Sequence, residues 1–356
     1  MSKKDVLSKL NRSVDRRSFL KACGVLGVGA VAGGILQSKY DVVGLGRGLK
    51  KVSQTRIAMG TYVTVTAVHT SRDLAEDAIG RAFDEMDRLI AVFNRHDSAT
   101  PVSVLNRDGS VSGPPPELKD VLGWARQFNG VTAGRFDVTV KPLVDLFSET
   151  VSRNALTLPR DDQIAAALGR VDAGGVDITA KEIRFKNDGM GVTLDGIAKG
   201  YIVDMMSAAL AERGVTDHLV NAGGDIRTSG ANASGKPWTV AVEDPKKKRS
   251  YPAVIRMTDG AVATSGSYEI YYDREKVFHH VVDPQSGVSP QHSVSATVRA
   301  RSVMVADALS TGVFVAEPQE GVMLVESIHP TYDTTCLILG ADGERYACGA
   351  WVATQA

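Results

Sequence analysis

The chain has 356 residues, with 41 basic and 41 acidic side chains and a hydrophobic share of 43%. This is the composition of a globular protein, long enough for one large domain or two modest ones. Because the formal net charge is zero, the charge gives no reason to expect nucleic acid or an anionic membrane surface as the main partner. Composition alone names no function.

The first forty residues form a targeting pattern. Arg16 and Arg17 precede a weakly apolar, glycine-rich stretch at 22–36, and the triplet 30–32 offers small alanines at the positions that a signal peptidase reads. Paired arginines in this context are the twin-arginine export address, which is not an anchor. A membrane helix is disfavoured because an apolar run of about 15 residues is shorter than the roughly 20 that span a bilayer. We expect a twin-arginine signal peptide at 1–32, a linker at 33–52 and a periplasmic domain at 53–356, with association with the inner membrane left open.

Hydrophobic periodicity predicts the elements that follow. Alternating β-branched residues at 55–68 predict a strand pair or a long strand broken at Gly60, and apolar residues at three- and four-residue steps predict a helix at 73–93. The pattern further predicts helices at 117–128, 161–168 and 198–213 and short strands over 218–298. It also predicts a helix at 306–315 and a closing hairpin near Asp342. Helices and strands intermix without a regular βαβ rhythm, which indicates an α+β fold of mixed sheets with packed helices.

The cysteines allow two interpretations. Cys336 and Cys348 lie at equal distances from Asp342 in the closing hairpin, so they can face each other across its strands. A cross-strand disulfide fits an oxidising compartment, and two inert buried thiols fit equally well with the spacing. Cys23 does not fit a lipoprotein site, because the apolar segment follows it.

Two glycine-containing turns are candidates for binding an anion. At 193–201 a strand ends, the chain turns at Gly196 and a helix begins, so free backbone N–H groups lie beside Lys199, an arrangement that suits a phosphate. At 221–226 tandem glycines permit close backbone approach to a ligand. Taken singly, each pattern is equally typical of an ordinary turn, and Asp225 is equally suited to capping its turn.

Two later segments carry acid, hydroxyl and imidazole groups. His280 precedes an Asp–Pro turn and could accept a proton near neutral pH, although a lone histidine is usually structural. Asp307 and Thr311 lie one helical turn apart and share a face. With a backbone carbonyl from elsewhere they would form an oxygen site suited to Mg2+. The alternative is an aspartate that only favours the helix dipole.

Taken together and in this order, the segments resemble the ApbE family of FAD:protein FMN transferases. The resemblance extends over about 55–340 and is carried by 59–61, 97–98, 105–106, 134–139 with 142–143, 196–201 with Asp204, 221–226, 263–266, 280–287 and 306–311. An ordered series of blocks is far more specific than any one block.

The resemblance implies an Mg2+-dependent enzyme that moves the FMN moiety of FAD onto a Ser or Thr hydroxyl of a target protein through a phosphoester bond and releases AMP. It implies two intertwined lobes with the active site between them. The implied metal ligands are Gly196, Asp307, Ser310 and Thr311; the implied FAD-binding residues are Met59, Asn94, Asp137, Lys199, Asn221, Gly224 and Asp225; the implied catalytic residues are His280, as the base, and Asp307.

Two positions depart from the common family pattern, and a third residue lies in a block of unusual composition. Thr193 stands where the family often has Asp, Asp195 where it often has Gly, and Asn94 lies in a block that is usually more aromatic. We expect Asp195 to supply the carboxylate from a shifted position. The expected partners are FAD and an acceptor that, given export, is a membrane-bound redox protein with a periplasmic flavin domain. The alternatives are an FAD-binding accessory protein of a respiratory electron-transfer system, an Mg2+-dependent FAD pyrophosphatase and, more remotely, a solute-binding protein.

Overall fold

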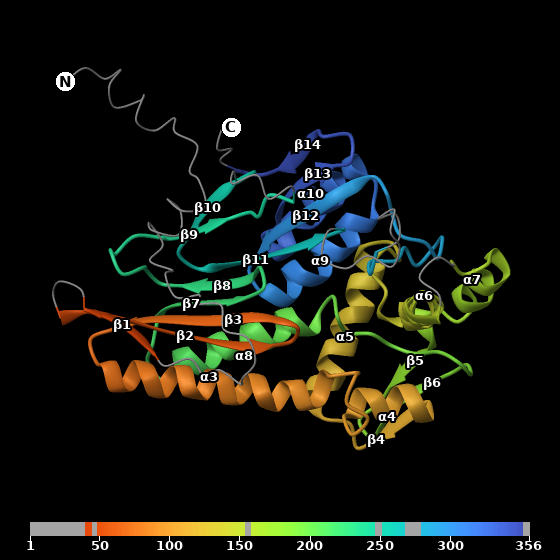
Figure 1. Ribbon diagram of the computed structural model, residues 1–356, viewed down its shortest axis with the longest axis horizontal. Coiled ribbons are helices and arrows are strands. Elements are labelled where there is room, and N and C mark those ends of the chain that lie inside the picture. The colour runs from red at the N-terminus through yellow and green to blue at the C-terminus, as the bar shows by residue number, and fades with distance from the viewer. Residues whose placement is uncertain (1–39, 45–47, 154–157, 246–250, 268–278, 352–356) are drawn as a thin grey trace.

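The structure is a computed structural model that describes residues 40–44, 48–153, 158–245, 251–267 and 279–351 (Figure 1). The expected signal peptide at 1–32 lies outside these residues. Within them, no helix is both long enough and apolar enough to cross a membrane.

A nine-stranded sheet, antiparallel throughout, organises the molecule (Figure 1). In spatial order its strands are β1 (Asp41–Gly44), β2 (Lys50–Ala58), β3 (Thr61–His69), β7 (Asp217–Ala222), β8 (Asp225–Ser229), β11 (Gly260–Gly266), β12 (Ser293–Ala300), β13 (Thr335–Gly340) and β14 (Arg345–Cys348). The predicted strand pair broken at Gly60 is confirmed as β2 and β3. Residues 41–44 and 50–52, expected to be linker, are strands of this sheet, because their backbone groups pair with the neighbouring strands.

Two smaller sheets complete the β-structure of the described residues. β9 (Trp238–Ala241) pairs with β10 (Val254–Met257), and β6 (Glu182–Phe185) lies between β4 (Ser110–Ser112) and β5 (Val176–Ile178). Apolar side chains of β9 and β10, among them Val240 and Ile255, pack with Ile226 and Val262 of the large sheet. The β9–β10 pair therefore covers part of that sheet.

The helices are α3 (Arg72–Phe93), α4 (Pro101–Asp108), α5 (Pro116–Val131), α6 (Lys141–Arg153), α7 (Asp161–Leu168), α8 (Ala198–Glu212), α9 (Val303–Val315) and α10 (Pro318–Tyr332). α3 begins at the cap Ser71, whose hydroxyl accepts a hydrogen bond from Leu74 N–H, and it buries one apolar face against α8 and β3. α9 packs on β11 and β12, and α10 packs on β13 (Figure 1).

The mixed arrangement confirms the predicted α+β class, and the predicted helices correspond to α3, α5, α7, α8 and α9. Three helices, α4, α6 and α10, did not stand out in the sequence. α4 has a readable signal, because Thr100 caps it and Pro101 occupies its first turn. α10 contains Pro330, a residue that normally ends a helix, and this weakened its pattern.

Candidate active site

The beginnings of α8 and α9 are fastened together. The Asp204 carboxylate of α8 accepts hydrogen bonds from the N–H groups of Val303 and Met304, at 3.0 and 2.9 Å, and so caps α9 from a neighbouring helix. A Cβ at position 200 would lie 2.6 Å from the carbonyl oxygen of Val303, so only glycine allows this approach. This close packing fixes the start of α9 against α8.

Asp307 is held at this junction. Its side chain is 5% exposed, and its Oδ2 accepts a hydrogen bond from the N–H of Gly200 at 3.0 Å. Burial raises the pKa of Asp307 well above its ordinary value, and the negative charge of Asp225 raises it further, while Lys199 and the Gly200 N–H act in the opposite direction. The aspartate is therefore part of a cluster of charges around the start of α8.

Hydroxyl groups from two elements meet one turn further along α9. The Ser265 hydroxyl of β11 lies 2.8 Å from that of Ser310 and 3.1 Å from that of Thr311. A Cβ added at Gly196 would lie 3.0 Å from the Thr311 hydroxyl, so the turn before α8 contacts this helix directly. The structure thus places the turn at Gly196 beside Thr311, which lies on the same helix as the other predicted metal ligands, Asp307 and Ser310. It adds Ser265, which only the family block at 263–266 had indicated.

A second buried carboxylate lies beside this cluster. Asp225 is 2% exposed, and its Oδ2 is 3.3 Å from the Lys199 ammonium group. Within the described residues, no three His, Cys, Asp or Glu side chains are grouped as a metal site. The candidate site is of another kind, since it combines buried carboxylates with hydroxyl groups.

Asp225 follows a tight turn that joins β7 to β8. Gly223 and Gly224 have φ of 64° and 105°, and the Asn221 side chain accepts a hydrogen bond from Gly224 N–H at 3.0 Å. A Cβ at Gly223 would lie 2.5 Å from the Thr61 hydroxyl, so the turn contacts the start of β3. Met59, with φ of 50°, lies in the β2–β3 turn directly before β3. Four predicted FAD-binding positions, Met59, Asn221, Gly224 and Asp225, are therefore neighbours.

Two other predicted FAD-binding residues have local structural roles. The Asp137 carboxylate accepts hydrogen bonds from the N–H and hydroxyl of Thr139 and from the Asn129 amide, at 2.7, 2.6 and 3.1 Å. Burial raises its pKa, and the hydrogen bonds from Thr139 oppose that rise. Asn94 ends α3, and its Oδ1 accepts a hydrogen bond from the N–H of His96 at 3.1 Å. Both side chains fix the backbone around them.

The predicted base, His280, follows a buried histidine. The His279 ring lies with its centroid 5.4 Å from that of Phe314 on α9, edge to face, and 6.4 Å from that of His280. His279 Nε2 lies 3.0 Å from the Pro290 carbonyl oxygen. The segment therefore packs against α9 beyond Thr311, and His279 is a structural neighbour that the sequence did not single out.

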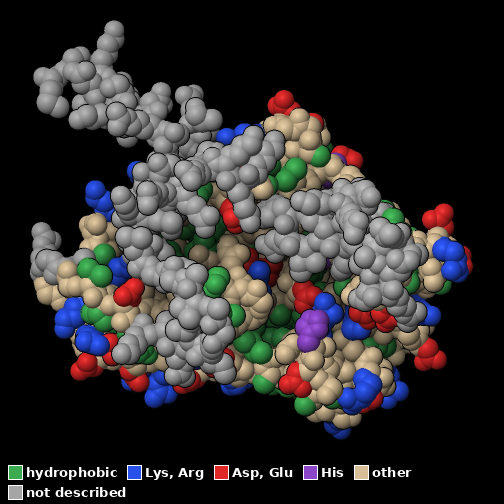
Figure 2. Space-filling model, viewed as in Figure 1, with side chains coloured by type: hydrophobic (Ala, Val, Ile, Leu, Met, Phe, Trp, Pro, Cys, Tyr) green, Lys and Arg blue, Asp and Glu red, His purple; other side chains and the backbone are tan. Residues whose placement is uncertain are grey.

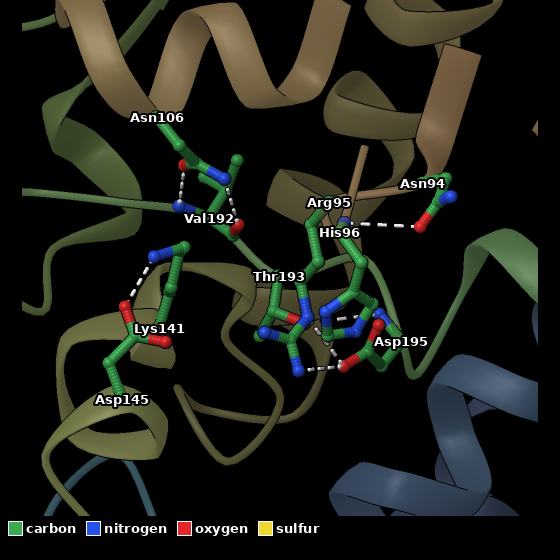
Figure 3. Close-up of polar contacts among 9 residues, drawn as sticks. All are labelled: Asn94, Arg95, His96, Asn106, Lys141, Asp145, Val192, Thr193 and Asp195. Carbon is green, nitrogen blue, oxygen red and sulfur yellow. Dashed lines mark hydrogen bonds and ion pairs between the residues drawn. The ribbon is translucent and has the colours of Figure 1, made fainter. Parts of the chain in front are cut away.

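The two departures from the family pattern, Thr193 and Asp195, lie beside Arg95 (Figure 3). Nε and Nη2 of Arg95, from the loop after α3, both lie 3.0 Å from Asp195 Oδ2, and the Asp195 side chain is 61% exposed. Thr193 accepts a hydrogen bond from the Asp195 N–H at 3.4 Å. Asp195 contributes to the raised pKa of Asp307, so it lies within electrostatic range of the α8–α9 cluster. Its pairing with Arg95 was not readable from the sequence.

The Asn106 side chain anchors the strand-like segment that leads to this turn. Its amide donates to the Val192 carbonyl oxygen at 2.9 Å, and its Oδ1 accepts from the Val192 N–H at 2.7 Å (Figure 3). Lys141 of α6 pairs with Asp145 nearby (Figure 3). On the face drawn in Figure 2, acidic and basic side chains and a histidine gather near the centre.

Comparisons with known proteins agree with this geometry. A sequence model of the ApbE family matches residues 59–336. The FAD:protein FMN transferase of Vibrio cholerae is 32% identical over 244 residues, which are 68% of this chain and 70% of that protein. The enzyme of the same name from Haemophilus influenzae is 30% identical over 293 residues, 78% of this chain and 84% of that protein.

Solved structures lead to the same family. The flavin transferase ApbE from Vibrio cholerae superposes with a TM-score of 0.73 at 27% identity, covering 85% of this chain and 98% of that chain. The ApbE protein from Thermotoga maritima also superposes with a TM-score of 0.73 at 27% identity, over 86% of this chain and 96% of that chain. The order of the sequence blocks, the fold and the relatives lead to one conclusion: the chain belongs to the ApbE family.

Proposed function

We propose that this chain transfers the FMN moiety of FAD to a Ser or Thr hydroxyl of a target protein, with Mg2+ as the cofactor and AMP as the second product. Membership of the ApbE family makes the chain a flavin transferase, and the metal, the acceptor hydroxyl and the released nucleotide are the proposed additions. The observation that supports the proposal is the contact of the Gly196 turn with Thr311, one helical turn from the buried Asp307 on α9.

The chemistry of the donor set fits Mg2+. The carboxylate of Asp307, the hydroxyls of Ser310 and Thr311 and the carbonyl of Gly196 are hard oxygen donors, which this ion prefers. Two buried carboxylates, Asp307 and Asp225, lie close enough to act on each other electrostatically, and Lys199 pairs with Asp225. Negative charge in a buried position is costly, so a bound cation would suit the charge of the cluster as well as its oxygens. Bound there, Mg2+ would neutralise charge that develops on the pyrophosphate oxygens of FAD.

The remaining roles follow from the reaction. The acceptor oxygen attacks the phosphorus on the flavin side, the bond from this phosphorus to the bridging oxygen breaks, and AMP leaves with the bonding electrons. Lys199, in the first turn of α8, would stabilise the charge of the phosphates. His280 is the proposed base that takes the proton of the acceptor hydroxyl, a contribution of roughly 10²–10⁴-fold in rate.

The twin-arginine pattern at Arg16 and Arg17 supports a periplasmic site of action. An acceptor in that compartment, proposed to be a membrane-bound redox protein with a periplasmic flavin domain, would receive its flavin after export. The proposed location can be checked by fractionating cells that produce the tagged chain, with an R16K/R17K variant as the control. Retention of the variant in the cytoplasm is expected, and unchanged export of it would contradict the proposal.

The activity is tested by incubating the purified chain with FAD, Mg2+ and candidate acceptor domains and measuring the acceptor mass. An increase by one FMN is expected, and it should disappear when the acceptor Ser or Thr is replaced by Ala or when the metal is chelated. Release of FMN and AMP without an acceptor would instead identify a pyrophosphatase. Full flavinylation by an Asp307→Asn variant would contradict the proposed metal site.

A further inference from the structure

The two cysteines of the closing hairpin face each other. Cys336 of β13 and Cys348 of β14 are direct partners in the antiparallel register, and both are free thiols with their Sγ atoms 3.4 Å apart. Directly opposite residues on antiparallel strands have the Cα separation that a disulfide requires. Small rotations of the two side chains would bring the sulfurs into bonding distance.

The surrounding backbone holds the strands in this register. Gly349, directly after Cys348, has φ of 77°, and a Cβ there would lie 2.2 Å from a methyl carbon of Thr335. The indole of Trp351 donates a hydrogen bond to the Cys348 carbonyl oxygen at 3.0 Å. The end of β14 is therefore fixed against the start of β13, and these contacts hold the two thiols opposite each other.

The thiols differ in their chemistry. The hydrogen bond from the Cys336 thiol lowers the pKa of Cys348 to about 7, and the same interaction together with burial raises the pKa of Cys336. A thiolate is the attacking form in disulfide exchange. Cys348 lies on the edge strand and is 5% exposed, whereas Cys336 is fully buried. Within the described residues the pair belongs to no cluster of three His, Cys, Asp or Glu able to hold a metal.

We propose that Cys336 and Cys348 are an oxidisable pair that closes into a cross-strand disulfide and ties the edge strand β14 to the nine-stranded sheet. The Cys348 thiolate attacks a small or protein disulfide and expels one thiol. Cys336, as its thiolate, then attacks the Cys348 sulfur and expels the second thiol. The pair loses two electrons and two protons, and the donor disulfide takes both up as it becomes two thiols.

Closure would act mainly on the hairpin. β14 is joined to the sheet on one side, through a short register from Leu339↔Arg345 to Cys336↔Cys348. A covalent link across its far end removes the freedom of this strand to separate locally. We expect slower hydrogen exchange at the β14 amides in the oxidised protein and a Tm higher by on the order of 5 °C.

The test uses the full chain with Cys23→Ser, which leaves only the pair. The protein is reduced, freed of reductant and exposed to oxidised glutathione, either folded or during refolding from denaturant, and free thiols are then alkylated under denaturing conditions. The only tryptic site between the cysteines is Arg345, so a closed pair links peptides 302–345 and 346–356. We expect this linked species, a mass lower by two hydrogens and no alkylation.

The Cys336→Ser and Cys348→Ser variants are the controls and should carry at most one glutathione, with neither the linked peptides nor the rise in Tm. Two alkylated thiols in both the folded and the refolded sample would overturn the proposal. So would a stable mixed disulfide with glutathione that does not close. The outcome is independent of flavin transfer, because no flavin, metal or acceptor is present.

Discussion

Asp307 and Asp195 lie near the same candidate site but in opposite environments. Asp307 is 5% exposed on a helix that is buried on nearly all sides, with a backbone N–H fixed on its carboxylate. Asp195 is 61% exposed in a turn, and a single arginine side chain holds it. Several packed elements fix the position of Asp307, whereas Asp195 depends on one ion pair. Substitutions at Asp307 are therefore expected to have the larger effect on the proposed metal site.

The largest effect is expected from a substitution of the buried Asp307. Asp307→Asn keeps the shape but removes the charge, and we expect flavin transfer to fall roughly 100-fold or more, since metal stabilisation of the transition state is worth several kcal/mol. A calorimetric titration of the variant with Mg2+ should show weaker binding of the ion than in the native chain. Asp120→Asn, an exposed change on α5, is the control and should alter neither quantity. Equal Mg2+ affinity in both variants would show that the ion binds elsewhere.

The packing of the junction is tested by Gly200→Ala. The added Cβ would meet the Val303 carbonyl oxygen at 2.6 Å, so the start of α9 must move. Overpacking of this kind costs about 1–3 kcal/mol of unfolding free energy, measured by urea titration. Gly123→Ala in α5 is a matched control, because nothing lies within 4 Å of its added Cβ, and a gain of about 0.5–1 kcal/mol is expected there. Similar results for both glycines would refute the tight α8–α9 contact.

A buried histidine beside α8 predicts that stability depends on pH. His218 of β7 lies under α8, with Nε2 2.7 Å from the Ser207 hydroxyl, and burial lowers its pKa below the ordinary value of 6.5. The unfolded chain therefore binds a proton more readily than the folded chain. Stability should fall as the pH drops from about 6.5 toward the lowered pKa, by at most about 1.4 kcal/mol per pH unit.

Urea unfolding measured across this pH range, for the native chain and for His218→Gln, checks that contribution. The variant should lose this part of the slope, and the exposed His96 changed to Gln should keep it. Identical slopes in the native chain and in His218→Gln would mean that the buried imidazole does not titrate as expected.

The exposed side of the comparison should give the smallest effect. Arg95→Ala removes the partner of Asp195, and because Asp195 is 61% exposed, the unfolding free energy should change by less than about 1 kcal/mol. A freed Asp195 carboxylate would add negative charge near Asp307, so we expect a shift of a few-fold in Mg2+ affinity rather than loss of turnover. The Mg2+ affinity of Arg95→Lys should lie between that of the native chain and that of Arg95→Ala. A loss as large as that of Asp307→Asn would mean that Arg95 itself contacts the substrate.

Sequence patterns over a few residues predicted the helices and hairpins that such short patterns determine. The apolar spacing of α3 and the tight turns of the β2–β3 and β13–β14 hairpins are read along a few residues, and all three are present. The order of the nine strands depends on pairing between distant segments, such as β3 with β7, and short-range periodicity does not specify it.

The candidate site likewise contains residues that the sequence predicted and contacts that it did not. The ordered blocks identified Gly196, Asp307 and Thr311, which the fold brings together. Ser265 joins them through contacts between side chains far apart in the sequence, and the Arg95–Asp195 pair spans 100 positions. Spacing along the chain does not encode such pairs. The structural use of Asp137 was equally hidden, because its hydrogen-bond donors become apparent only when the turn is formed.

The capping of α9 by Asp204 has a consequence for anyone who wants to redesign this enzyme. A helix whose first turn is completed by a side chain of another helix cannot be exchanged between relatives as an isolated cassette. α8 and α9 would have to be transplanted as a pair, with Gly200 and Asp204 retained. Diversity in acceptor choice is then best sought in loops outside this pair, where substitutions leave the α8–α9 junction intact.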